Sequence, residues 1–290
     1  MANLKDLKTR INSVKSTQKI TSAMKMVAAA KLRRAQESAE ANRPYSSRMQ
    51  QVISGLASKA SKATAPALLV GRETVKSHLL IVVSADKGLC GGFNGSIARQ
   101  TRLEIKRLEE EGKSVLLYMV GKKAADNLGR EITDKIFERV ENLQGSNLDY
   151  NKVDTVSHKI LTGFSDTSFD HVSIIYNQFV NAITQNVVVT PLIPVQINED
   201  QEDTGASNYE YEPDENELLE QLLPRNVTTQ IYSALLESFA AELAARMTAM
   251  DNATRNAGDM IDSLTLVYNR TRQANITKEL IEIISGAEAL

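Results

Sequence analysis

The sequence predicts an α/β fold class with a long antiparallel two-helix coiled coil, formed by the N- and C-terminal segments, and a central α/β domain. Three observations support this. No glycine precedes Gly55 and no proline follows Pro224, so both chain ends favour unbroken helices. Residues 1–62 carry a net charge of +10, although the 290-residue chain has a net charge of only −2. The middle of the chain alternates apolar runs with glycine-containing turns.

The first helix is expected over residues 3–58, inside an N-terminal coiled-coil segment 1–62. Its apolar residues recur at spacings of three and four, which is typical of a helix with one apolar face. They are Leu4, Leu7, Ile11, Val14, Ile20, Met24, Val27, Leu32 and Ala35. Gln18, Thr21 and Lys25 interrupt this frame, so either the apolar stripe shifts or the helix contact is partly polar. Pro44 is expected to mark a bend.

Residues 76–196 read as a central, Rossmann-like α/β domain with a mostly parallel sheet. The apolar runs predict five strands: His78–Ser84, Ser114–Val120, Ile132–Phe137, His171–Phe179 and Val187–Val195. The intervening segments predict three helices: Ser96–Glu111, Lys122–Leu128 and Lys152–Leu161. Strands that alternate with helices indicate parallel pairing, and the last two strands have no helix between them.

Residues 197–224 are expected to form an acidic connector. Residues 199–220 contain ten Asp or Glu and no Lys or Arg, which is typical of a solvated segment. Four leucines at 218, 219, 222 and 223 suggest a short amphipathic helix inside it.

Residues 225–290 are expected to form the C-terminal coiled-coil helix, with the helix itself over 226–284. Its apolar stripe comprises Leu236, Phe239, Leu243, Met247, Met250, Ala257, Ile261, Leu264, Tyr268, Ile276, Leu280, Ile283 and Ile284. A long helix with a half-apolar surface is stabilised mainly by burying that surface. Two such helices at opposite chain ends can bury their stripes against each other as an antiparallel coiled coil.

Composition excludes several classes of protein. No apolar run approaches the 18 or more residues of a membrane span, so no direct membrane insertion is expected. The N-terminal residues lack the apolar core of a secretory signal, so we expect mature sequence. The single cysteine, Cys90, allows no intrachain disulfide, which favours a reducing compartment. His78, His158 and His171 have no ligand-spaced partner, so structural or surface roles are expected.

The turn from Asp86 to Gly95 is the most plausible nucleotide-binding candidate, because it lies between a strand and a helix. Its spacing matches neither G-x-G-x-x-G nor G-x-x-x-x-G-K-[ST]. A tight turn with unusual backbone angles is the simpler interpretation. Cys90 is read as a small buried residue in preference to a reactive thiol. No catalytic constellation and no metal or cofactor site is predicted, although a nucleotide-dependent enzyme remains the alternative.

The basic N-terminal helix is a second alternative, since its cations could bind nucleic-acid phosphates. These cations are Lys8, Arg10, Lys15, Lys19, Lys25, Lys31, Arg33 and Arg34. They lie all around the helix and no aromatic residues accompany them. A solvated face, or a face that meets an acidic protein surface, is therefore the preferred interpretation, and no nucleic acid is expected among the partners.

Three segments resemble one family. LKTRINSVKSTQKITSAMKMVAAAKLRRAQ at the start, SADKGLCGGFN in the middle and LTLVYNRTRQANITKELIEIISGAEAL at the end are similar to the landmarks of gamma subunits of bacterial F-type (rotary) ATP synthases. The three matches occur in order and span the whole chain.

The resemblance implies a non-catalytic rotor of the central stalk. In this family the helix pair turns inside a head of three alpha and three beta subunits and couples proton flow through the membrane ring to ATP synthesis or hydrolysis at beta sites. The implied partners are alpha, beta, epsilon and the membrane-embedded c-subunit ring. The implied location is the cytoplasmic face of the bacterial inner membrane, as a peripheral protein.

The resemblance also implies residue roles. Contacts with beta are expected at Met24, Lys25, Lys87, Arg246, Arg272, Gln273 and Thr277. An apolar bearing tip is expected at Ile276, Leu280, Ile283 and Ile284. Contacts with the membrane ring or epsilon are expected at Tyr209, Tyr211 and Glu212.

Overall fold

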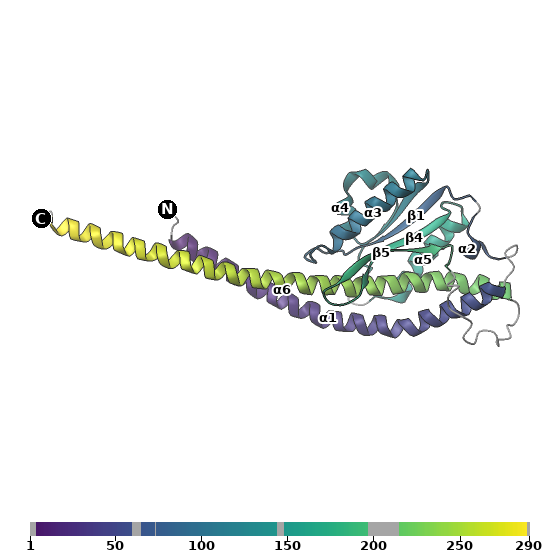
Figure 1. The fold of residues 1–290 in the computed structure, drawn as a ribbon, viewed down its shortest axis with the longest axis horizontal. Helices are drawn as coiled ribbons and strands as arrows, with labels where there is room; N and C mark the ends of the chain where they lie inside the picture. Colours follow the sequence, from purple (N-terminus) through teal and green to yellow (C-terminus); the bar gives the residue numbers. More distant parts are fainter. Residues whose placement is uncertain (1–3, 60–64, 73, 144–147, 197–214, 289–290) are drawn as a thin grey trace. The chain divides into compact units, whose positions relative to one another are not determined.

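The computed structural model describes residues 4–59, 65–72, 74–143, 148–196 and 215–288 (Figure 1). Two long helices, α1 (Leu4–Lys59) and α6 (Glu215–Glu288), enclose the other elements in the chain order. The chain divides into two compact units, and both long helices contribute to each. We call Met1–Ala29 with Arg246–Leu290 the helical unit, and Ala30–Ala245 the α/β unit.

The α/β unit contains one five-stranded sheet. Its strands are β1 (Ser77–Val83), β2 (Ser114–Val120), β3 (Ile136–Val140), β4 (His171–Phe179) and β5 (Gln185–Ile193). They lie in the order β3-β2-β1-β4-β5, and only the β4–β5 pair is antiparallel. The predicted fold class, with a mostly parallel central sheet and long terminal helices, is confirmed.

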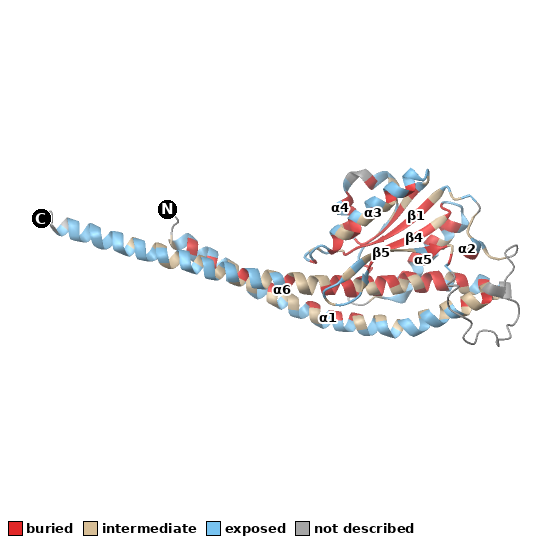
Figure 2. Cartoon of the chain, in the orientation of Figure 1, coloured by how far each residue is buried: buried red, intermediate tan, exposed pale blue. Residues whose placement is uncertain are grey.

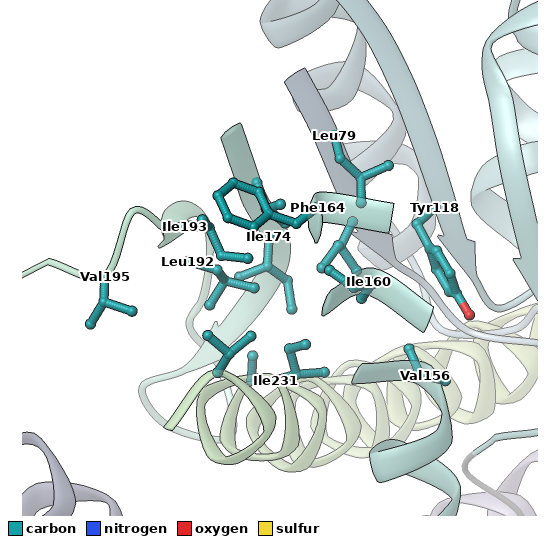
Figure 3. Close-up of a cluster of buried hydrophobic side chains, with 14 of the residues drawn as sticks. Leu79, Tyr118, Val156, Ile160, Phe164, Ile174, Leu192, Ile193, Val195 and Ile231 are labelled. Atoms are coloured by element: carbon teal, nitrogen blue, oxygen red, sulfur yellow. The ribbon is translucent and has the colours of Figure 1, made fainter. Parts of the chain in front are cut away.

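Helices cover both faces of this sheet. The unit contains α2 (Ala67–Val70), α3 (Phe93–Glu110), α4 (Lys123–Leu128), the 3-10 segment η1 (Gly129–Lys135) and α5 (Tyr150–Ser165). β1 is buried on both faces: Leu80 and Val82 pack with α3 and α4, whereas Leu79 and Ile81 pack with α5 and α6. Figure 3 shows the second core, in which Ile231 of α6 faces the strands and α5. The continuous apolar run of β1 is explained by this double burial.

Two strand boundaries differ from those expected. Residues 132–135 belong to η1, so the third strand begins only at Ile136. Ile132 is apolar because it is buried against α3 and α4, and a buried 3-10 residue has the same sequence signal as a strand residue. β5 begins two residues before the expected Val187 and ends at Ile193.

The second long helix begins earlier than its local sequence suggests. α1 continues through Pro44, as its expected span of 3–58 requires, whereas α6 includes Pro224 and begins eleven residues before the expected position 226. Leu219 and Leu223, expected in a short separate helix, are fully buried in the first turns of α6. Burial therefore maintains the helix across residues 215–224, whereas residues 197–214 of the predicted connector lie outside the described residues.

The helical unit is an antiparallel helix pair (Figure 2). On α1 the buried residues Leu7 and Ile11 continue in a strict heptad frame through Val14, Gln18 and Thr21. On α6 the buried residues of this unit are Met250 and Ala257. The repeat of three and four residues is the pattern that brings two helices together along one seam.

Candidate functional site

A polar layer interrupts the seam of the helical unit. The hydroxyls of Thr21 and Thr254 lie 2.8 Å apart, and Lys25 Nζ donates to Asp251 Oδ1 at 2.5 Å. The sequence left open whether the apolar stripe of α1 shifts at Gln18, Thr21 and Lys25 or whether the contact between the helices is partly polar. These hydrogen bonds show that the stripe does not shift and that the contact is partly polar. Ile20 and Val27, expected in the stripe, are instead 60% and 57% exposed.

The polar layer also carries an ion-pair network. Asp251 accepts a second bond from Arg255 at 2.7 Å, one turn further along α6. The hydrogen bond from Lys25, together with the charges of Arg255 and Lys25, lowers the pKa of Asp251. Because these side chains are partly solvated, the network contributes more to the arrangement of the charges than to stability.

The last turns of α6 extend past the start of α1. In an antiparallel helix pair, the residue numbers of two facing residues add up to a nearly constant value. This sum is 275 for Thr21–Thr254 and 276 for Lys25–Asp251. Leu4, the first residue of α1, therefore lies opposite residue 271 or 272. The four residues of the predicted bearing tip lie beyond this point and are 49–67% exposed: Ile276, Leu280, Ile283 and Ile284.

The apolar surface of this tip lies on a different side of α6 from the seam. The seam positions of α6 alternate at intervals of three and four residues through Ile261, Leu264 and Tyr268. The next positions at these intervals are all polar: Thr271, Asn275, Lys278 and Glu282. At about 100° per residue, the four apolar tip residues form a separate stripe spanning about 100° of the helix. The expectation that these residues complete the seam was wrong, because they make an independent, unburied surface.

The turn after β1 has the unusual backbone that the sequence predicted. Leu89 and Gly91 have φ values of 65° and 58°. Asn94 stabilises the turn: its Oδ1 accepts from the amide of Ala85 at 3.0 Å, and its Nδ2 donates to Cys90 Sγ at 3.1 Å. Cys90 is 2% exposed, as expected for a small buried residue.

The chain itself fills the place where a doubly wound sheet would bind a nucleotide. That place lies at the carboxyl ends of β1 and β4, where the strand order reverses. Here Ala85, Cys90 and Phe93 pack against Ala241 of α6, and Phe179 closes the cluster. Asn177 Nδ2 also donates to the carbonyl of Phe93 at 3.5 Å. The α6 helix thus occupies the crevice that a dinucleotide would need.

In the described part of the chain, none of the helices combines the length and apolarity that a membrane crossing requires. Within the same residues, His, Cys, Asp and Glu nowhere form a group of three that could hold a metal ion. The surfaces that remain as functional candidates are the α6 tip, the polar layer and the turn after β1.

The sequence is similar to known proteins over its whole length. A family model described as "ATP synthase" matches residues 3–290. The ATP synthase gamma chain of Acidiphilium cryptum is 54% identical, and that of Paracoccus denitrificans is 53% identical; in both cases all of each chain is covered. The chain belongs to the ATP synthase gamma-chain family.

Solved structures agree with this family assignment. The central stalk and c-ring structure of the Tetrahymena thermophila mitochondrial ATP synthase contains a chain that is 30% identical, with a TM-score of 0.60; 81% of this chain and 99% of that chain are covered. A rotor chain of the Euglena gracilis enzyme is 18% identical, with a TM-score of 0.68, 94% of this chain and 98% of that chain being covered. The second likeness concerns the fold alone.

The predicted contact residues fall into distinct environments. Arg272, Gln273 and Thr277 are exposed on the α6 tip, and Lys87 is exposed on the turn after β1. Met24, Lys25 and Arg246 are half-buried. Lys25 is already paired with Asp251 within the chain, which sequence reasoning did not foresee. Tyr209, Tyr211 and Glu212 lie outside the described residues.

Sequence reasoning missed several exposed apolar residues. Ile281 is 57% exposed on the tip, and Leu266 is 61% exposed on α6. Leu89 is 63% exposed on the turn after β1. A helical wheel places Ile281 next to the tip stripe, so the sequence did contain that signal. Nothing local marks Leu89, since its exposure depends on the backbone angle of the turn.

Proposed function

We propose that this chain is the non-catalytic central-stalk subunit of a bacterial ATP synthase. Its partners are the alpha and beta subunits of the head, the epsilon subunit and the membrane-embedded c-subunit ring. In this role it rotates within the head and couples proton flow through the ring to synthesis or hydrolysis of ATP at beta sites. The observation that carries the proposal is an unburied apolar tip at the end of a paired helix, in a chain of the gamma family.

The tip suits a rotating contact for a physical reason. Apolar side chains interact without fixed direction, whereas hydrogen bonds require particular angles and distances. A helix end that presents Ile276, Leu280, Ile283 and Ile284 can therefore turn inside an apolar sleeve without breaking directional bonds.

Transmission of torque requires a different kind of contact. Coulomb attraction acts over several ångströms without a strict geometry, so charged and polar groups can follow a moving partner. The exposed Arg272, Gln273 and Thr277 lie just before or within the apolar tip and fit this role toward beta. The further proposed contacts with beta are Lys87, Lys25 of the polar layer, the adjacent Met24, and Arg246.

The proposed location follows from the partners. A chain bound to the membrane ring is held as a peripheral protein at the cytoplasmic face of the inner membrane, without crossing it. Tyr209, Tyr211 and Glu212 are the residues proposed to touch the ring or epsilon.

Reconstitution tests the proposed function. The purified full chain alone should show no ATP turnover, whereas its addition to purified alpha and beta subunits should produce sustained ATP hydrolysis. ATP hydrolysis by the chain alone, or a mixture whose rate does not depend on the chain, would contradict the proposal. Titration of the chain alone with ATP also tests the nucleotide-dependent alternative, which requires the turn at 86–95 to bind phosphate.

A further inference from the structure

Three helices of the α/β unit border an open cavity of about 570 Å³. Among the lining residues are Asn42 and Tyr45 of α1, Tyr150 and Asp154 of α5, and Arg225 and Thr229 of α6. In each pair the two residues are three or four positions apart, so each helix turns one face toward the cavity. A cavity of this size that collects polar and aromatic side chains from several elements is typical of a small-molecule site.

The helix α1 packs loosely beside this cavity. Between Ala35 and Ile53, a stretch that the structure describes in full, no residue of α1 is buried. Asn42 connects the stretch to α6, because its Nδ2 donates to Ser233 Oγ at 2.5 Å. The two helices are therefore bridged by a polar contact, and space for a ligand remains next to it.

Two opposite charges line the cavity without neutralising each other. Asp154 and Arg225 are both exposed, and neither has an ion-pair partner among the described residues. Their charged atoms thus lie further apart than the roughly 4 Å of a direct ion pair. Partial burial raises the pKa of Tyr150, the charge of Asp154 raises this pKa further, and the charge of Arg225 lowers it. Both charges therefore act on the same hydroxyl group of the cavity wall.

Two tyrosine rings complete the wall. Tyr45 is 54% exposed and Tyr150 is 43% exposed. An edge contact with Tyr232 of α6 holds the Tyr150 ring in place, with 5.3 Å between the ring centroids. Exposed aromatic rings can pack against another ring and can attract an ammonium group.

A ligand that satisfies all of these groups carries both charges. A carboxylate suits the guanidinium of Arg225, which binds such groups through paired hydrogen bonds, and an ammonium suits Asp154 and the tyrosine rings. We propose that the cavity between α1, α5 and α6 binds a small zwitterion of the amino-acid class, with an aromatic side chain against Tyr45 and Tyr150. The site does not depend on the proposed function, since it uses only residues of this chain.

Three matched probes test the proposal on the purified full chain. L-phenylalanine carries both charges, 2-phenylethylamine carries only the ammonium, and 3-phenylpropanoate carries only the carboxylate. L-phenylalanine should bind with a dissociation constant on the order of 1 mM, the range expected of a small ligand in an open cavity. Each single-charge probe should bind about tenfold more weakly, because one charged contact is missing. Titration followed by ligand-observed NMR measures these affinities.

Substitutions at the two charges assign each contact. Arg225→Gln should weaken L-phenylalanine about tenfold and leave 2-phenylethylamine unchanged, since that probe has no carboxylate. Asp154→Asn should weaken L-phenylalanine and 2-phenylethylamine and leave 3-phenylpropanoate unchanged. Lys152→Gln is the matched control, because Lys152 is exposed on α5 and does not line the cavity. It should bind all three probes as the wild type does.

Amide hydrogen exchange locates the ligand independently. Saturating L-phenylalanine should slow exchange in α1 around residues 42–45, because the bound ligand joins this loosely packed stretch to α5 and α6. Binding without any change of exchange in α1 would place the ligand elsewhere and overturn the site.

The outcomes of the titrations are equally distinct. A preference for L-phenylalanine that is lost in Arg225→Gln and Asp154→Asn and kept in Lys152→Gln supports the site. Equal affinities for the three probes would indicate apolar adsorption only, and they overturn it, as does the absence of binding at ten times the expected dissociation constant. Neither result affects the proposed function, which reconstitution with alpha and beta tests separately.

Discussion

The α/β unit buries its apolar residues, whereas the helical unit leaves most of its large ones in solvent. Among the described residues, only five core hydrophobic residues belong to the helical unit: Leu7, Ile11, Ala28, Met250 and Ala257. The same unit holds eleven of the nineteen exposed large hydrophobic residues found in the described chain. An apolar surface of this extent on a folded protein indicates a partner. One unit is therefore stabilised by its own core, while the other presents a surface for other subunits.

The largest expected effect tests where stability lies. Ile231 of α6 is fully buried in the core of the α/β unit. Ile231→Ala should lower the free energy of unfolding by roughly 3–4 kcal/mol, because a cavity remains where the side chain was. Urea denaturation followed by circular dichroism measures the loss.

Ile281 on the same helix provides the control for this substitution. It is 57% exposed at the tip, so Ile281→Ala should change the free energy of unfolding by less than about 0.5 kcal/mol. An equal loss of unfolding free energy in the two variants would show that the tip is buried within the free chain. The contrast between a buried core in the α/β unit and an exposed tip would then be wrong.

Acid should destabilise the α/β unit through His78. Burial, with a smaller contribution from the charges around it, lowers the pKa of His78 from 6.5 to about 4. Below pH 6.5, His78 therefore binds a proton in the unfolded chain, whereas in the folded chain it does so only as the pH falls to about 4. Stability is complete above pH 6.5, and roughly 3 kcal/mol is lost as the pH falls to 4.

Midpoints of urea denaturation measured at pH 7, 6 and 5 test whether stability falls with falling pH. His78→Gln should flatten the dependence between pH 6.5 and 5, while His158→Gln, at an exposed position, should not. An unchanged slope in His78→Gln would place the acid sensitivity elsewhere.

The polar residues at the start of the α6 tip should affect ATP synthesis by the assembled complex and leave the stability of the free chain unchanged. Combined Arg272→Ala and Gln273→Ala substitutions should reduce proton-driven ATP synthesis about tenfold, the size expected when an important polar contact is removed. Both residues are exposed, so the Tm of the free chain should stay the same. Full coupling in this variant would show that torque passes through other residues.

The smallest expected effect concerns the polar layer. Combined Thr21→Val and Thr254→Val substitutions should stabilise the seam by about 1 kcal/mol, because both partners of one partly buried hydrogen bond become apolar together. Amide hydrogen exchange of α1 and α6 near these residues should slow. Faster exchange would mean that the hydroxyl pair is needed for close packing.

Much of this fold could be predicted because its signals are local. The strands His171–Phe179 and Ser114–Val120 were predicted at their observed boundaries. Ser114–Val120 is a largely apolar run between Lys113 and Gly121, and His171–Phe179 begins directly after Asp170. The third strand, which begins later than predicted, shows what local sequence signals cannot distinguish. Ile132 is apolar because of what packs on it, and local periodicity cannot separate a buried 3-10 residue from a strand residue.

The candidate contacts show the same limit. Exposure of Ile276, Leu280, Ile283 and Ile284 depends on which face of α6 packs on α1 and on where α1 begins, and both are properties of the pairing. The pairing of Lys25 with Asp251 joins residues 226 positions apart, so no window of sequence contains both.

The sequence by itself determined the long terminal helices, the mostly parallel sheet and the family, because helix propensity, apolar runs and motifs are properties of neighbouring residues. Only the tertiary structure decided which apolar residues became core and which stayed exposed. Burial depends on the residues that come together from distant parts of the chain. That is why Leu223 is buried, whereas Leu89 faces solvent on a strained turn.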